Sequence, residues 1–235
     1  MKNQIVASIA ALPFALGAVF AGTGAANAQV IQLDDMDANG GTISYDGTGG
    51  ALIGKNIGID LITGIGTKFN NEENPLTCID CFLNFETGLN MGEEPYAFAA
   101  GGFITVTGTV KDLNDDNDIL IADGTFLSGK FTEKTFGSAV DLGLMGIATF
   151  SSIGVDTKDA AIGEYFGIDT TEYHFGQTSI AIGEVNVEAN GGFTGTVTNA
   201  DLDNIPVDVD VPEPTVLFGL GVVAAGIVSR RRKNS

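Results

Sequence analysis

The sequence predicts a mainly β fold, either an antiparallel β-sandwich or a barrel-like domain, with one short helix. Three observations carry this prediction: glycine and threonine are abundant, apolar segments are short, and apolar residues alternate with polar ones. Phe103–Val110 shows the alternation clearly, with Ile104, Val106 and Val110 on one face and threonines mainly on the other. This pattern is typical of a half-buried strand, and regular turns between short strands favour an antiparallel sandwich or barrel.

Further segments also have the composition of strands. Ile119–Phe126 follows an acidic turn and is the expected partner of Phe103–Val110. The others are Thr42–Tyr45, Asn56–Ile62, Lys130–Phe136, Ala139–Phe150, Glu172–Ile182, Glu184–Ala189 and Phe193–Thr198. The apolar positions change parity at Gly183, so we expect a β-bulge or a strand break at this glycine.

One helix is expected between the strands. Asp156 or Thr157 can cap its start, and residues 160–166 supply an apolar side. Gly167 can end it, because glycine adopts the left-handed conformation that closes many helices.

The N-terminus has the organisation of a secretory signal peptide. Lys2 supplies a positive start, Ile5–Phe20 is an apolar stretch, and Ala26-Asn27-Ala28 is a small-x-small cleavage site. Gln29 is then the first residue of the mature protein, and residues 1–28 are left out of fold reasoning.

The C-terminus has three parts in a fixed order. Val211-Pro212-Glu213-Pro214 is a short extended linker, since each proline fixes its backbone and restricts the residue before it. Residues 215–229 are uncharged and predict a transmembrane helix, whose length of roughly 22 Å is short for a ~30 Å hydrocarbon core. Residues 230–233 (Arg230, Arg231, Arg232 and Lys233) form a basic stop, which stays on the cytoplasmic side of a membrane.

This tail, residues 211–235, resembles the PEP-CTERM sorting signal of Gram-negative bacteria. The resemblance implies that Pro212, Glu213 and Pro214 are recognised by an exosortase, a membrane-embedded processing enzyme that cuts the tail. It further implies an inner-membrane-anchored precursor that is passed to the cell surface or the extracellular space. Proteins with this signal tend to accompany exopolysaccharide and biofilm matrix, and they vary outside the tail.

Residues 29–210 remain as one exported β-rich domain, and its composition excludes several partners. The region between the two ends keeps six lysines, whereas all thirty acids lie in it or in the linker. It is therefore more acidic than the whole chain, whose net charge is −19. Such a surface repels nucleic acid and anionic membrane, and it favours divalent cations and solubility.

Absent residue types narrow the catalytic options. No arginine precedes Arg230, there is no tryptophan, and His174 is the sole histidine. Phosphate sites usually use arginine and a triad hydrolase would have to use His174, which we expect to be a packing or surface residue. Chemistry on two carboxylates stays open, because thirty acids always contain some pair.

The acidic turn before Ile119 is the most suggestive ligand site. Oxygen-bearing side chains alternate along it, and a further aspartate falls at the twelfth position of a loop that begins at Asp112. The candidate calcium ligands are Asp112, Asn114, Asp116, Asp118 and Asp123. The spacing resembles a calcium loop of EF-hand or dockerin type, but Asn117 replaces the usual glycine and strands flank it. A solvated turn without an ion is the alternative.

Cys78 and Cys81 are the only cysteines. In an oxidising compartment, a local disulfide that pins the loop after Asn74-Pro75 is the leading interpretation. A redox pair would need a helix start, and a zinc site would need two further ligands.

Together these features predict an exported, non-enzymatic surface or matrix protein, structural or adhesive in a biofilm or exopolysaccharide. The alternative is a calcium-dependent carbohydrate-binding module, and a hydrolase built on carboxylates is a third possibility. No cofactor is expected other than calcium.

Overall fold

A computed structural model of the chain describes residues 29–35, 40–67, 75–92, 96–113, 118–141, 146–169 and 171–206. These residues belong to the compact unit Ala28–Val209. The signal segment, the sorting tail and residues 114–117 of the acidic turn lie outside the described residues. In the described part, no helix has the length and apolar character needed to cross a membrane.

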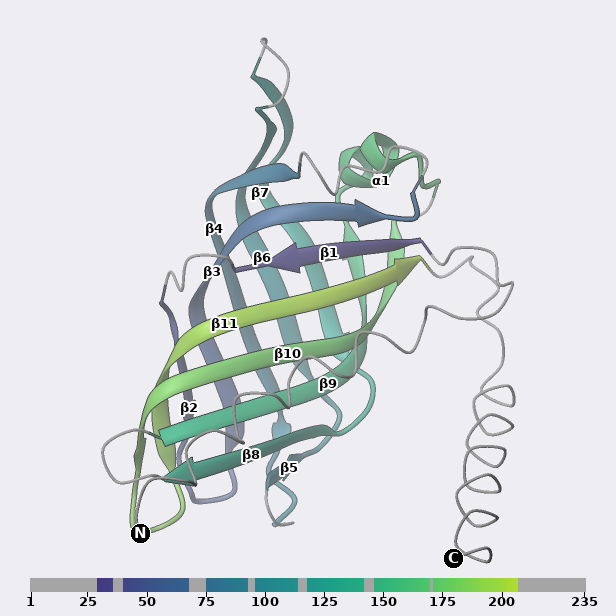
Figure 1. Cartoon of the computed structure of the whole chain (residues 1–235). Helices are drawn as coiled ribbons and strands as arrows, with labels where there is room; N and C mark the ends of the chain where they lie inside the picture. The colour runs from purple at the N-terminus through teal and green to yellow at the C-terminus, as the bar shows by residue number, and fades with distance from the viewer. Residues whose placement is uncertain are drawn as a thin grey trace, which may run out of the picture. The chain divides into compact units, whose positions relative to one another are not determined.

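Eleven described strands form one antiparallel sheet, accompanied by one short helix (Figure 1). The strands are β1 (Val30–Asp34), β2 (Thr42–Tyr45), β3 (Ala51–Ile65), β4 (Leu76–Leu89), β5 (Tyr96–Phe98), β6 (Gly101–Asp112), β7 (Ile119–Phe131), β8 (Thr135–Asp141), β9 (Gly146–Lys158), β10 (Glu172–Val187) and β11 (Phe193–Pro206). The helix α1 spans Ala160–Phe166. The expectation of a mainly β, antiparallel fold with one short helix is confirmed.

The sheet closes on itself. Paired neighbours lead from β3 through β4, β6, β7, β9, β10 and β11, and β1 then pairs with both β11 and β3. Toward the other ends of β3 and β11, β2 takes the place of β1 between them. Closure pairs the backbone groups that an open sheet would expose at its edges.

Strand β9 pairs with two different strands along one of its edges. Its first half pairs with β8, in a register that joins Gly146 to Asp141, and its second half pairs with β7, in a register that joins Lys158 to Leu127. Between these halves the chain turns from β7 into β8 at residues 132–134. The expected strand over Lys130–Phe136 is therefore wrong, because it ignored this turn.

The core is built partly from glycines that face aromatic rings on neighbouring strands. Each such glycine lies directly opposite the aromatic residue in the register, and a Cβ added to it would overlap the ring. The pairs are Gly54 with Phe85, Gly137 with Phe150, and Gly154 with Phe175. The ring fills the space that the missing side chain leaves, so glycine here is a packing residue, as in aromatic rescue of strand glycines.

Of the predictions for the helix ends and the bulge, two are confirmed and one is wrong. Gly167 ends α1 in the left-handed conformation, as expected, but Asp159 caps its start by accepting a hydrogen bond from the backbone N–H of Ala161. The prediction of Asp156 or Thr157 as the cap is wrong, because β9 continues through Lys158. The bulge at Gly183 is confirmed: the register with β11 shifts after this glycine, although β10 continues as one strand to Val187.

Candidate functional site

The β6–β7 hairpin carries the candidate calcium ligands. Figure 1 shows this hairpin extending beyond the neighbouring strands at the end where α1 lies. The Asp112 carboxylate accepts a hydrogen bond of 2.7 Å from the Tyr165 hydroxyl of α1. Asp118 forms an ion pair of 3.1 Å with Lys111 across the hairpin. These two carboxylates therefore already contact protein groups, while Asn114 and Asp116 lie outside the described residues.

The hairpin register separates Asp123 from the turn. Asp112 lies opposite Ile119, whereas Asp123 lies opposite Thr109, whose hydroxyl donates a 2.7 Å hydrogen bond to it. Three residues of strand span roughly 10 Å, so Asp123 does not meet Asp112 around one ion as a twelfth-position ligand would. Within the described ranges, no three His, Cys, Asp or Glu side chains gather in a way that could hold a metal ion.

The two cysteines lie on β4 rather than in a loop. The expected loop location is wrong, because β4 runs continuously through a bulge at this point, where Asp80 has a φ of 51°. The structure joins the sulfurs of Cys78 and Cys81 at 2.06 Å, and both side chains are buried. The bridge spans the bulge, so it holds the irregular segment between two regular parts of the strand.

His174 is exposed on the outer face of β10, between the inward-facing Tyr173 and Phe175. It is a surface residue of a strand, one of the two roles that its sequence context predicts.

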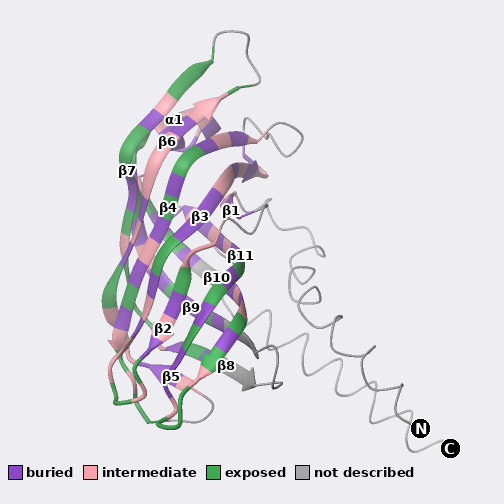
Figure 2. Ribbon diagram, turned by 90° about the vertical axis from the view of Figure 1, so that its left-hand side faces the viewer, coloured by how far each residue is buried: buried purple, intermediate pink, exposed green. Residues whose placement is uncertain are grey.

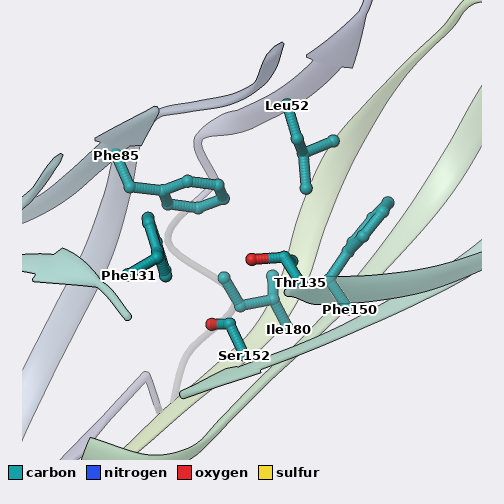
Figure 3. Close-up of a pocket in the computed structure, with 7 residues that line it drawn as sticks. All are labelled: Leu52, Phe85, Phe131, Thr135, Phe150, Ser152 and Ile180. Carbon is teal, nitrogen blue, oxygen red and sulfur yellow. The ribbon is translucent and has the colours of Figure 1, made fainter. Parts of the chain in front are cut away.

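One small cavity lies among the described residues of the interior. Figure 3 shows a cavity lined by Leu52, Phe85, Phe131, Thr135, Phe150, Ser152 and Ile180. Its volume of about 10 Å³ is at the lower limit for one water molecule, and sites for organic ligands are far larger. The Thr135 hydroxyl has no hydrogen-bond partner among the described residues, so a single water is the occupant that this cavity suits.

Sequence reasoning missed a buried polar cluster inside the closed sheet. The Lys158 ammonium lies 2.5 Å from Oδ1 of Asp156 and 2.8 Å from Oδ1 of Asn204, and it lies 4.1 Å from the ring centroid of Tyr173. Each of these four residues is less than 5% exposed. Oδ2 of Asp156 and the Tyr173 hydroxyl have no hydrogen-bond partner among the described residues.

Burial changes the proton affinities of this cluster. Removal from water lowers the pKa of Lys158 to about 8, against the opposing attraction of Asp156. Burial likewise raises the pKa of Asp156, although Lys158 works in the other direction. Both shifts narrow the gap between the pKa values of the two groups, which lowers the free-energy cost of transferring a proton from the amine to the carboxylate.

A second polar cluster lies on the outer face, where β1 meets β11. Asp34 is opposite Asp201 and Gln32 is opposite Asp203. Partial burial, followed by repulsion from Asp201 and Asp203, raises the pKa of Asp34 to about 7. Burial and Asp201 raise the pKa of Asp203 to about 6. The aspartates of β1 and β11 are visible in the sequence, but the cluster could be predicted only by knowing that these two strands pair.

No protein-family model matches the chain. A search of curated proteins found no match, and a search of solved structures found none either. Functional inference therefore depends on the chain's own residues.

Proposed function

We propose that this chain is an exported surface or matrix protein of a Gram-negative bacterium, sorted and processed through its PEP-CTERM-like tail. One observation carries the proposal: a signal-type N-terminus is combined with a proline pair, an apolar run and a basic cluster in that order. Each part has a physical role in export. The basic cluster stays in the cytoplasm, the apolar run anchors the precursor in the inner membrane, and the proline linker lies outside.

The processing enzyme is the expected partner of Pro212, Glu213 and Pro214. Two prolines hold the linker extended, which suits a segment that must lie in the groove of an exosortase-type enzyme. After cleavage, the domain before the linker is released to the cell surface or the extracellular space. The chain is then the substrate of an enzyme and has no enzymatic role of its own.

Two features of the described domain support a structural or adhesive role. The cavity lined by Phe85 and Phe150 holds about 10 Å³, too little for an organic ligand, so we place the contact with such a ligand on the outer surface. The joined cysteines suit an oxidising location outside the cytoplasm.

The outer face of β4, β6 and β7 is the surface that we propose for contact with extracellular polysaccharide. Figure 2 shows buried positions alternating with more exposed ones along these strands. On β6, Thr105, Thr107 and Thr109 point outward and are half-buried, while Phe82 on β4 and Phe103 on β6 are exposed. Hydroxyl groups that can donate and accept hydrogen bonds, set beside exposed rings, suit the polar and apolar faces of a sugar chain.

Neutralising the basic cluster tests the sorting proposal in the native host. Changing Arg230, Arg231, Arg232 and Lys233 to glutamine should leave uncut precursor in the cell and remove the processed form from the cell surface. Fractionation followed by intact-mass measurement reports both outcomes. The matched control is Lys55→Gln, which neutralises an exposed cation of β3 and should be sorted normally. Unchanged delivery of the cluster variant would overturn the proposal.

A calcium-dependent carbohydrate-binding module is the second candidate, because oxygen ligands alternate at Asp112, Asn114, Asp116 and Asp118. Titration calorimetry of the full chain with Ca²⁺ tests it. Heat that disappears in the Asp116→Ala variant would support this function. No heat and no thermal shift at millimolar Ca²⁺ would remove it.

A further inference from the structure

We propose that Lys158 and Asn204 become joined by an intramolecular isopeptide bond, with Asp156 as the catalytic residue that carries the proton. The bond would tie β9 to β11 across β10, inside the closed sheet. This inference concerns the folded domain alone and does not depend on the proposed sorting function.

The two reacting side chains are already in contact. Nζ of Lys158 lies 2.8 Å from Oδ1 of Asn204, so the amide carbon bonded to that oxygen is an electrophile beside the amine. The Asn204 amide is held in this orientation at its other end. Its Nδ2 donates hydrogen bonds to the backbone oxygens of Leu202 (2.9 Å) and Ile31 (3.2 Å), which leaves Oδ1 facing the lysine.

The surroundings favour the neutral amine, which is the nucleophilic form. The side chains of Lys158 and Asp156 are 1% and 0% exposed, and a buried ion pair is stabilised less well than one hydrated by water. Transfer of one proton from the ammonium to Asp156 neutralises both groups at once. The lowered pKa of the lysine and the raised pKa of the aspartate both favour that transfer.

The reaction needs no reagent other than the protein. Lys158 gives a proton to Asp156, and the free amine forms a bond from Nζ to Cγ of Asn204. The protonated Asp156 stabilises the resulting oxyanion and gives its proton to Nδ2, after which the bond between Cγ and Nδ2 breaks and ammonia leaves. The Asp156 carboxylate then takes the surplus proton from Nζ and passes it to the ammonia. The products are a secondary amide and ammonium, so a charged lysine and a neutral amide become a neutral amide link and a released cation.

Asp156 has a free oxygen for this task. Oδ1 contacts the lysine, whereas Oδ2 is buried and has no hydrogen-bond partner among the described residues. An orphaned carboxylate oxygen in a core is unfavourable unless a proton or a partner comes to it. The Tyr173 ring covers the amine, and burial of all four residues keeps out the water that would compete as a nucleophile.

Peptide mapping of the purified full chain tests the bond. Trypsin cleaves after Lys158 only when its amine is free, so a linked protein should resist cleavage there. A second protease that cuts at acidic residues should release two peptides joined through Lys158 and Asn204. Their combined mass should be lower than the sum by one ammonia. Mapping is required in addition to intact mass, because cyclisation of an N-terminal Gln29 would lose the same mass. Cleavage at Lys158 with unlinked peptides would overturn the proposal.

Variants separate the bond from its catalysis. Asp156→Asn keeps the shape of the side chain but cannot carry the proton, so Lys158 should become cleavable and the full mass should return. Lys130→Arg, at an exposed position of β7, should leave the link intact, whereas Lys158→Arg should abolish it. A link that persists in Asp156→Asn would overturn the role of Asp156. If that variant does not fold, the map of the unaltered protein still decides whether the bond exists.

Discussion

The two faces of β11 border charged groups in different surroundings. On the inner face, Asn204 belongs to a cluster in which the charges of Lys158 and Asp156 are opposite and both are buried. On the outer face, the like-charged Asp201 and Asp203 lie beside Asp34 and are partly reached by water. The inner face of β11 therefore borders a compensated ion pair of β9, whereas its outer face carries part of an acidic cluster.

The difference follows from access to water. Burying an isolated ion costs several kcal/mol, so the inner face tolerates an ion only with a partner of opposite sign in contact. The outer face tolerates like charges because solvent screens them, and Asp34 and Asp203 retain their protons to a higher pH because they are partly buried. A charged side chain on the inner face therefore needs a partner of opposite charge, because water is excluded there. On the outer face, a carboxylate without such a partner can be neutralised by binding a proton.

Removing the Lys158 amine should have the largest effect. The Lys158→Met variant loses the proposed link to Asn204, and it leaves the Asp156 carboxylate buried without its partner, which alone should cost about 3–5 kcal/mol of unfolding free energy. Urea denaturation followed by fluorescence or circular dichroism measures this loss. The control Lys130→Met removes an exposed lysine and should change stability by roughly 0.5 kcal/mol or less.

The double variant Asp156→Leu, Lys158→Met makes the comparison sharper. It removes both charges and so should recover the part of the loss that the stranded carboxylate causes. If the single and double variants were equally unstable, loss of packing or of a covalent link would explain the effect, and charge compensation would not.

Much of the fold follows from local signals in the sequence. Alternation along Phe103–Val110 gave a strand whose inner and outer faces were assigned correctly, and Gly167 marked the helix end. Gly183 marked a bulge because a parity change has few other solutions in a strand. These features depend on a few consecutive residues, and the chain's own chemistry decides them.

Strand β9 shows what local signals could not give. Ser152, Asp156 and Lys158 face the interior, whereas Ile153 faces solvent and is 46% exposed. The usual rule that apolar residues point inward would have inverted the strand, and the buried cluster would have been assigned to the surface. Closure of the sheet places Asn204 and Tyr173 around these side chains, and partners so distant in the sequence leave no local pattern.

Two glycines on neighbouring strands differ in how much space surrounds them. Gly154 of β9 faces Phe175, and an added Cβ would lie 2.0 Å from the ring and 2.3 Å from the backbone oxygen of Lys130. Gly154→Ala should therefore destabilise the protein by about 2–3 kcal/mol, since the backbone cannot move aside easily. Gly183→Ala in β10 is the control, because its added carbon would meet only the Thr198 methyl group, at 3.0 Å. Equal losses in thermal or urea unfolding would refute the packing role of Gly154.

The smallest effect is expected on the acidic outer face, and its sign is a gain. The folded-state pKa of Asp34 is raised from 3.8 to about 7, so between these values the folded chain binds more protons than the unfolded chain. Stability therefore falls as pH rises through this window. Asp34→Asn should be near neutral at pH 4 and stabilising above pH 7, by roughly 1 kcal/mol or less because water screens this partly exposed group.

Thermal unfolding at several pH values distinguishes this local effect from a change in net charge. Glu188→Gln removes one negative charge from an exposed turn, away from the cluster, and should show no comparable gain above pH 7. If both variants were stabilised equally, general repulsion across an acidic surface would be the cause. A gain in stability that is confined to Asp34→Asn and rises with pH would assign the destabilisation to repulsion among the three carboxylates. It would also show that partial exposure to water screens this repulsion only incompletely.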